Sequence, residues 1–142
     1  MIQSFYIMKT LTVKSNIENV AAVTDFIAEF SEALDCPMKV QFQLNVAIDE
    51  IFSNISHYAY GDGIGDVTVS IDETPEKRGI VMIFSDSGMH YDPLEHEDPD
   101  VTLSVEKRAI GGLGLFIVKK TMDEVTYKFE DGKNILTLKK YF

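Results

Sequence analysis

Two side chains that could handle a metal and a phosphate stand one helical turn apart, at Glu50 and Asn54. The four-residue spacing places them on the same face of a helix. The amide oxygen of Asn54 is a hard, neutral ligand that suits Mg²⁺. The Glu50 carboxylate could take a proton from a hydroxyl nucleophile or from a water. The pair could equally be ordinary solvated helix residues, because this spacing occurs on many helices.

A second candidate, Asp86-Ser87-Gly88, follows the apolar run at 78–85. A carboxylate can accept a hydrogen bond from the exocyclic amino group of adenine, and glycine lets a base approach the backbone. Asp and Gly are also common choices where a strand ends in a turn. The motif is therefore compatible with an adenine pocket and with a plain turn.

A third candidate is the glycine cluster Gly111-Gly112-Leu113-Gly114, which precedes a helix expected over 115–124. Free N–H groups at a helix start, together with the helix dipole, form a site for anions. The spacing fits neither a Walker P-loop nor a Rossmann fingerprint. Phosphate binding is the functional interpretation, and a flexible helix start is the structural one.

The remaining sequence predicts the elements that position these residues, in the order β-α-α-β-β-loop-α-β-β. Strands are expected at 3–14, around 67–71, at 78–85, at 125–130 and at 134–142, and helices at 15–34, 37–61 and 115–124. The run 78–85 is expected to be a central strand buried on both faces. This order predicts an α+β fold, a two-layer α/β sandwich whose mixed, mostly antiparallel sheet is covered by about three helices.

Local signals mark where several elements begin and end. Ser15 and Glu18 match a capping box at the start of the first helix, and Pro37 suits the first turn of the second. Asp131-Gly132 predicts a hairpin between the last two strands. The apolar stripe of the second helix places Glu50 and Asn54 at the margin of the core, where a cleft could form; its residues are Leu44, Ile48, Ile51 and Ile55.

Composition narrows the class of protein. The 142 residues fit one domain, 1–142, and 45% are hydrophobic. A net charge of −10 argues against nucleic-acid binding, which needs a basic surface. The single cysteine, Cys36, excludes an internal disulfide and is expected to be a small buried residue rather than a nucleophile. With no apolar run of about 20 residues and no signal-peptide pattern, a cytoplasmic protein without a membrane span is expected.

Taken in order, these motifs resemble the Bergerat ATP-binding fold, which histidine kinases, gyrase, Hsp90 and MutL proteins share. Within that group the chain most resembles the bacterial anti-sigma factor serine/threonine kinases. The matching segments are DEIFSNISHYAYG at 49–61, FSDSGMHYDP at 84–93, GGLGLFIVKKTMDEVTY at 111–127 and the closing strands. Their order and spacing extend the resemblance over essentially the whole chain.

The resemblance implies ATP and Mg²⁺ as ligands and assigns a role to each candidate. Asn54 matches the Mg²⁺ ligand, and Glu50 matches the general base that activates a serine. Asp86 matches the carboxylate that reads the adenine amino group, with Gly88 beside it. The phosphate loop corresponds to Gly112 and Gly114, with Gly111 adjacent.

The chain departs from the family pattern at one place, and the pattern does not determine which cation of the loop contacts the phosphates. Where the family often has Lys followed by His, three residues after the Asn, this chain has His57-Tyr58. Lys107 or Arg108, in the lid-like loop at 89–110, could contact the β- or γ-phosphate or could be solvated.

By resemblance, the substrate would be a serine on a STAS-type anti-sigma-factor antagonist, and a homodimer is favoured. One alternative is a nucleotide-dependent binding switch that holds a sigma factor or an antagonist without transferring phosphate. Another is a simple ATPase in which water is the nucleophile.

Overall fold

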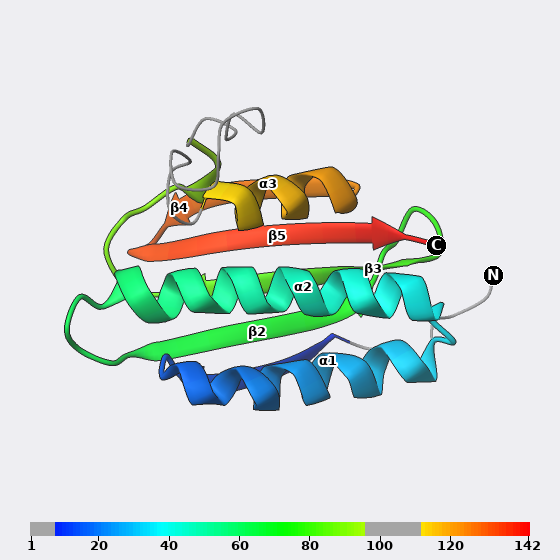
Figure 1. Ribbon diagram of the computed structural model, residues 1–142, viewed down its shortest axis with the longest axis horizontal. Coiled ribbons are helices and arrows are strands. Elements are labelled where there is room, and N and C mark those ends of the chain that lie inside the picture. Colours follow the sequence, from blue (N-terminus) through cyan, green and yellow to red (C-terminus); the bar gives the residue numbers. More distant parts are fainter. Residues whose placement is uncertain (1–7, 96–111) are drawn as a thin grey trace.

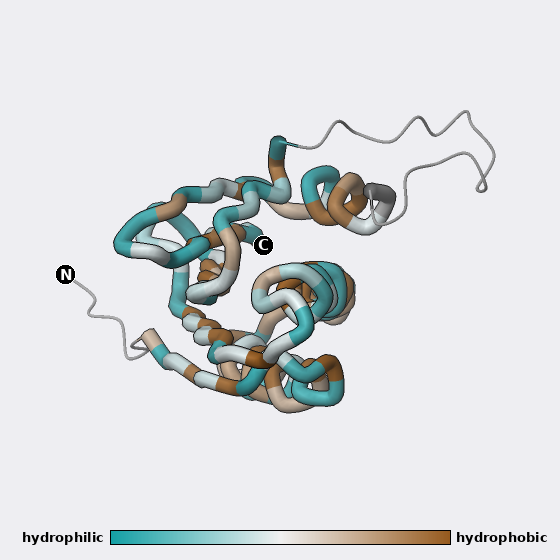
Figure 2. The backbone as a smooth tube through the Cα atoms, turned by 90° about the vertical axis from the view of Figure 1, so that its left-hand side faces the viewer, coloured by the Kyte–Doolittle hydropathy of each residue, from teal (hydrophilic) through white to brown (hydrophobic). Residues whose placement is uncertain are grey.

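The computed structural model describes residues 8–95 and 112–142, which form two layers, a five-stranded sheet with helices on one face (Figures 1 and 2). The strand order is β1-β2-β3-β5-β4, and every pairing between neighbouring strands is antiparallel. The elements are β1 (Lys9–Lys14), α1 (Val20–Ala33), α2 (Met38–Asn54), β2 (Asp66–Glu73), β3 (Gly79–Asp86), α3 (Gly112–Thr121), β4 (Glu124–Glu130) and β5 (Lys133–Tyr141). The predicted α+β sandwich is confirmed.

Strand β3 lies at the centre of the sheet, as the apolar run at 78–85 predicts, but it is fully buried on one face only. Ile80, Met82 and Phe84 point into the core beneath the helices. Val81 and Ile83 lie on the opposite face and remain partly exposed. The expectation of burial on both faces is wrong, because the described helices cover a single side of the sheet (Figure 2).

Helix α2 crosses the middle of the sheet, between α1 and α3 (Figure 1). Its predicted apolar stripe is buried at Leu44, Ile48 and Ile51. Glu50 and Asn54 are half-buried at the margin of this stripe, as the helical spacing predicts. Among the described residues, no helix combines the length and the apolar character that crossing a membrane requires.

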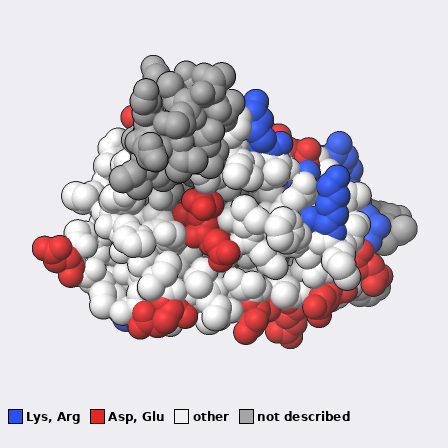
Figure 3. All heavy atoms as spheres, viewed as in Figure 1, with Lys and Arg blue, Asp and Glu red and all other residues white. Residues whose placement is uncertain are grey.

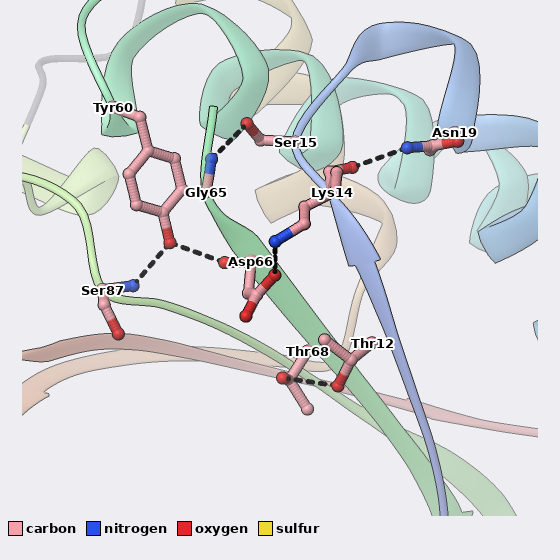
Figure 4. Close-up of polar contacts among 9 residues, drawn as sticks. All are labelled: Thr12, Lys14, Ser15, Asn19, Tyr60, Gly65, Asp66, Thr68 and Ser87. Carbon is pink, nitrogen blue, oxygen red and sulfur yellow. Dashed lines mark hydrogen bonds and ion pairs between the residues drawn. The ribbon is translucent and has the colours of Figure 1, made fainter. Parts of the chain in front are cut away.

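The predicted capping box at Ser15 is wrong. Ser15 is 2% exposed, and its hydroxyl accepts a hydrogen bond from the N–H of Gly65 at 3.2 Å instead of capping a helix (Figure 4). Its own N–H donates to the Gly65 carbonyl at 2.9 Å. The side chain thus ties the end of β1 to the start of β2, and a short 3₁₀ turn, Ile17–Asn19, leads into α1.

The second helix also ends differently from the prediction. Its α-helical part stops at Asn54 and continues as one π-helical segment, Ile55–Ala59, before the turn at Gly61, whose φ is +59°. Pro37 precedes the first turn as the N-cap residue instead of lying inside it. Segments of π-helix occur often at functional sites, so the change of helix type beside Asn54 is notable.

The C-terminal elements follow the predicted order with shifted boundaries. Helix α3 begins at Gly112 and ends at Thr121, so Glu124 belongs to β4 and not to the helix. The predicted hairpin is confirmed: Asp131 and Gly132 both have positive φ, +53° and +75°, as a two-residue turn of this kind requires.

Cys36 is buried at the junction of α1 and α2, as expected of a small core residue. Burial raises the pKa of its thiol. A buried, protonated thiol is a poor nucleophile, so Cys36 contributes packing.

Tyr60 joins the end of the helical layer to two strands (Figure 4). Its hydroxyl donates to the carbonyl of Asp66 at 2.6 Å and accepts from the N–H of Ser87 at 2.9 Å. Burial raises the pKa of this phenol. The ring lies against Gly65, where an added Cβ would come within 2.2 Å of it.

We expect Tyr60→Phe to lower the free energy of unfolding by about 0.5–1.5 kcal/mol, because two backbone groups lose their shared partner. Urea unfolding measures this change. Tyr141→Phe is the control, since it removes one hydroxyl that bonds only to the exposed carboxylate of Glu124. Equal midpoints for Tyr60→Phe and the wild type would contradict the assigned role.

Candidate functional site

A cavity lies between the helical layer and the sheet, and its space of about 500 Å³ includes open solvent. Concave sites with mostly apolar walls and a few polar groups are the usual binding places of small molecules. The predicted site residues that line it are Asn54 and Asp86. Mostly apolar and aromatic side chains complete the wall, among them Ile51, Tyr58, Phe84, Leu115 and Tyr127. Such a wall suits a flat, mostly apolar group with a few polar atoms.

Asp86 is the last residue of β3 and is 7% exposed. Its Oδ1 accepts two hydrogen bonds, from the N–H of Gly88 at 2.9 Å and from Nδ2 of Asn134 at 3.0 Å. No described residue donates to Oδ2. A buried carboxylate with one unused oxygen beside a cavity is suited to accept a hydrogen bond from a ligand.

Asn134 is a site residue that sequence reasoning missed. It lies on β5 directly opposite Asp86 in the strand register, and it is 8% exposed. The sequence contained one indication of this residue. Alternate residues of the strand face the core, as Leu136 and Leu138 do, so position 134 is also predicted to face the core. A polar residue occupies this position. A polar side chain at a core position needs partners, and these could be identified only in the fold.

Gly88 packs so closely against the helical layer that a side chain would not fit at this position. An added Cβ would lie 2.1 Å from the carbonyl oxygen of Ala59, the last residue of the π-helical segment. The N–H of Met89 donates to the same oxygen at 2.8 Å. The sequence suggests that this glycine lets a base approach, whereas in the structure the space beside it is filled by Ala59.

Glu50 lies against the first turn of α3. An added Cβ on Gly114 would come within 1.9 Å of Oε2 of Glu50, so the carboxylate fills the space that this glycine leaves. The structure thereby brings Glu50 to the glycine-rich helix start that also contains Gly112. Gly111 lies outside the described residues. Glu50 does not line the cavity, in contrast to Asn54 one turn later.

The helix dipole places partial positive charge at the start of α3, and the Glu50 carboxylate lies against this turn. Lys119 and Lys120 lie at the other end of the helix, in its last turn. Figure 3 shows acidic side chains along the edge of the molecule formed by α1, with lysine and arginine side chains on the α3 side. The cations considered in the sequence, Lys107 and Arg108, lie outside the described residues.

His57 takes no part in the cavity wall. It is exposed, and its Nδ1 lies 2.7 Å from the carbonyl oxygen of Ser53, one turn back on the helix. In the described parts of the chain, no three His, Cys, Asp or Glu side chains are grouped to hold a metal ion. A metal at this site would therefore depend on Asn54 together with oxygens of a ligand and of water.

The chain is similar in sequence to known proteins. A sequence model of the histidine kinase-like ATPase domain matches residues 13–140. The chain is 28% identical over 100 residues to the serine/threonine-protein kinase BtrW of Bordetella bronchiseptica, covering 70% of each protein. It is 29% identical over 101 residues to the serine-protein kinase RsbW of Listeria monocytogenes, covering 68% of this chain and 63% of that protein. It is also similar to RsbW of Bacillus mycoides, at 24% identity over 68% of this chain and 61% of the relative. The chain thus spans less than two thirds of these two RsbW proteins.

The two glycines of the site predict opposite effects of the same substitution. Gly88→Ala should lower the free energy of unfolding by about 1–3 kcal/mol, because the added methyl meets backbone atoms of Ala59 that cannot yield. Gly114→Ala should be neutral or stabilising by up to about 1 kcal/mol, because the methyl meets only the mobile end of Glu50 and alanine favours a helix. Thermal or urea unfolding of both variants tests the pair. Equal losses would contradict the two packing roles.

Proposed function

Because the chain belongs to the histidine kinase-like ATPase domain family, we propose that it binds ATP with Mg²⁺ and transfers the γ-phosphate to a serine of a partner protein. The observation that carries the proposal is buried Asp86, whose Oδ2 accepts from none of the described residues, in a cavity that Asn54 also lines. Glu50 lies one turn from Asn54, against the glycine-rich start of α3.

The half of the cavity near the sheet suits adenine. Oδ2 of Asp86 would accept a hydrogen bond from the exocyclic amino group, and the apolar wall formed by residues such as Ile51, Phe84 and Leu115 would cover the faces of the ring. The aromatic side chains of Tyr58 and Tyr91, whose ring centroids lie 6.2 Å apart, form part of the same wall.

The Asn54 side of the cavity would take the metal, and the start of α3, whose Leu115 also lines the cavity, would take the phosphates. Asn54 would hold Mg²⁺ through its side-chain oxygen, and the metal would supply charge neutralisation on the phosphate oxygens. The backbone N–H groups around Gly112 and Gly114, with Gly111 before them, would bind phosphate at the helix start.

In the transfer, Glu50 is the general base. Its carboxylate takes the proton from the serine hydroxyl while the serine oxygen bonds to the γ-phosphorus and the bond from phosphorus to the ADP oxygen breaks. The products are ADP and phosphoserine. Positioning and electrostatic stabilisation supply most of the rate in this class of reaction.

We propose that the protein substrate is a STAS-type anti-sigma-factor antagonist and that a sigma factor is a second partner. We also propose that the chain forms a homodimer in the cytoplasm. The relatives named serine-protein kinase RsbW support the choice of serine. Phosphorylation would add about −1.5 to −2 charges to the substrate. Repulsion from a chain with a net charge of −10 would then favour release of the product.

One observation favours the alternative of a nucleotide-dependent switch that transfers no phosphate. The Glu50 carboxylate rests against Gly114 and does not line the cavity. In a switch, this carboxylate would serve only to pack the start of α3. A simple ATPase would instead release inorganic phosphate in the absence of any partner.

The substitution Glu50→Gln distinguishes a kinase from a nucleotide-dependent switch and from a simple ATPase. For a kinase we expect the rate of phosphoryl transfer to fall by about 10²–10⁴-fold, because an amide cannot take the proton, while affinity for ATP stays close to that of the wild type. Transfer of labelled phosphate to a purified STAS protein, together with calorimetric titration of ATP, measures both quantities.

The matched control is Asp49→Asn, which removes the neighbouring exposed carboxylate and should leave transfer unchanged. Unchanged transfer in Glu50→Gln would remove Glu50 as the base. A wild-type protein that binds ATP but labels no partner would favour the switch, and one that does not bind ATP would contradict every form of the proposal.

Asp86→Asn tests the nucleobase assignment. The amide oxygen can keep the hydrogen bonds from Gly88 and Asn134, which turns the new NH₂ group toward the cavity. We expect affinity for ADP to fall by about 10–100-fold, because the new NH₂ group and the 6-amino group of adenine are both donors. Affinity for inosine diphosphate should rise relative to ADP, because O6 of its base accepts a hydrogen bond. Asp62→Asn, at an exposed loop residue, is the control. An unchanged preference for ADP would contradict the role of Asp86.

A further inference from the structure

We infer that Asn134 is the positioning residue that sets nucleobase selectivity, by holding Asp86 so that Oδ2 faces the cavity. The inference rests on the proposed binding of an adenine nucleotide and adds a residue on β5 to the base-reading machinery. Asn134 and Asp86 are 48 residues apart in the chain but directly opposite each other in the sheet.

The side-chain amide of Asn134 uses its whole hydrogen-bonding capacity within the protein. Nδ2 donates to Oδ1 of Asp86 at 3.0 Å and to the carbonyl of Met89 at 2.8 Å. Oδ1 accepts from the hydroxyl of Tyr127 at 2.6 Å and from the N–H of Tyr91 at 3.1 Å. Two donors and two acceptor positions are all that an Asn side chain has. Asn134 therefore acts on a nucleobase through Asp86 and not by direct contact.

Three of these partners also fix which way the amide points. Reversing it would place its oxygen against two acceptors, Oδ1 of Asp86 and the Met89 carbonyl, and its NH₂ group against the N–H of Tyr91. The donor toward Asp86 is thus held in one orientation before any ligand arrives, which is the condition for selective reading of a base.

Asp86 depends on this donor for its orientation. Among the described residues, only Asn134 and the N–H of Gly88 bond to the carboxylate, both at Oδ1. Without Asn134 a single bond from the adjacent turn remains, and the carboxylate can rotate about its side-chain torsions. A rotated carboxylate would discriminate poorly between a base with a 6-amino group and a base without one.

The same amide fixes the cavity wall that follows β3. By bonding to Met89 and Tyr91 it holds the chain immediately after the Asp86 turn, and both residues line the cavity. Tyr91 in turn stacks on Tyr58 at the end of the helical layer. One buried side chain therefore supports both the hydrogen-bonding edge and part of the apolar wall.

The test compares two ligands that differ only in the 6-amino group, ADP and purine riboside diphosphate, by calorimetric titration. For the wild type we expect ADP to bind about 10–100-fold more tightly, as a hydrogen bond to a buried charge implies. Asn134→Ala and the similarly sized Asn134→Leu should reduce this ratio to less than about threefold, since the bond that orients Asp86 is lost. Because both ligands carry the same phosphates, the ratio cancels any general change in nucleotide affinity.

Two further variants distinguish the role of Asn134 from a general loss of stability. Leu138→Ala creates a cavity on the same strand at a core residue that does not line the site, so it should lower the melting temperature but preserve the ratio. Tyr127→Phe keeps Asn134 and removes one of its partners, and it should lower the ratio by about two- to fivefold even if the Asn134 variants do not fold.

Three outcomes would decide against the inference, and a fourth would overturn the proposed function. The wild-type ratio persisting in Asn134→Ala, or in Tyr127→Phe if the Asn134 variants do not fold, would overturn it. An equal loss of the ratio in Leu138→Ala would also overturn it, because loosening of the sheet would then be sufficient. A wild-type ratio near one would show that Asp86 does not read the amino group. Failure of the wild type to bind either ligand would instead overturn the proposed function itself.

Discussion

The contact between Gly88 and the backbone of Ala59 sets how closely the helical layer approaches the sheet at the site. No side chain fits between them, and the N–H of Met89 bonds to the Ala59 carbonyl. Tyr60 joins the same helix end to the residue after Asp86. Because Asn54 and Asp86 lie within a few residues of this junction, their relative positions follow from it. Ala59 and Met89, which meet at this contact, also line the cavity.

The two halves of the site are built with different stiffness. On the sheet side, Asp86 and Asn134 belong to a buried network in which the amide has no free capacity, and such networks hold a unique geometry when every member is satisfied. On the helix side, Glu50 is half-buried and meets Gly114 through the mobile end of its side chain. This division supports a function in which the base is read by a fixed surface while the groups around the phosphates adjust.

The sequence allowed prediction of the elements and of two residues that line the cavity, Asn54 and Asp86, because these depend on local pattern. Alternating and helical spacing identified the strands, the helices and the face that carries Glu50 and Asn54. The features that it missed depend on pairing between distant segments. Ser15 bonds to a residue 50 positions away and Asn134 to one 48 positions away. The capping pattern at Ser15 was locally sound, but in the fold the hydroxyl bonds to Gly65 at the start of β2.

The neutral side chain at position 54 fits the charge of the whole protein. With a net charge of −10, the chain repels a polyanionic nucleotide at long range, so local groups must offset that repulsion. A carboxylate at position 54, one turn from Glu50, would add to the repulsion and would also create an acidic pair able to attract cations without nucleotide. An amide oxygen can bind a metal without this charge, so the metal would be held firmly only together with phosphate oxygens. In the proposed function Asn54 would therefore bind metal and nucleotide jointly and Glu50 would take up a proton, whereas in the alternative switch the Glu50 carboxylate would only pack the start of α3.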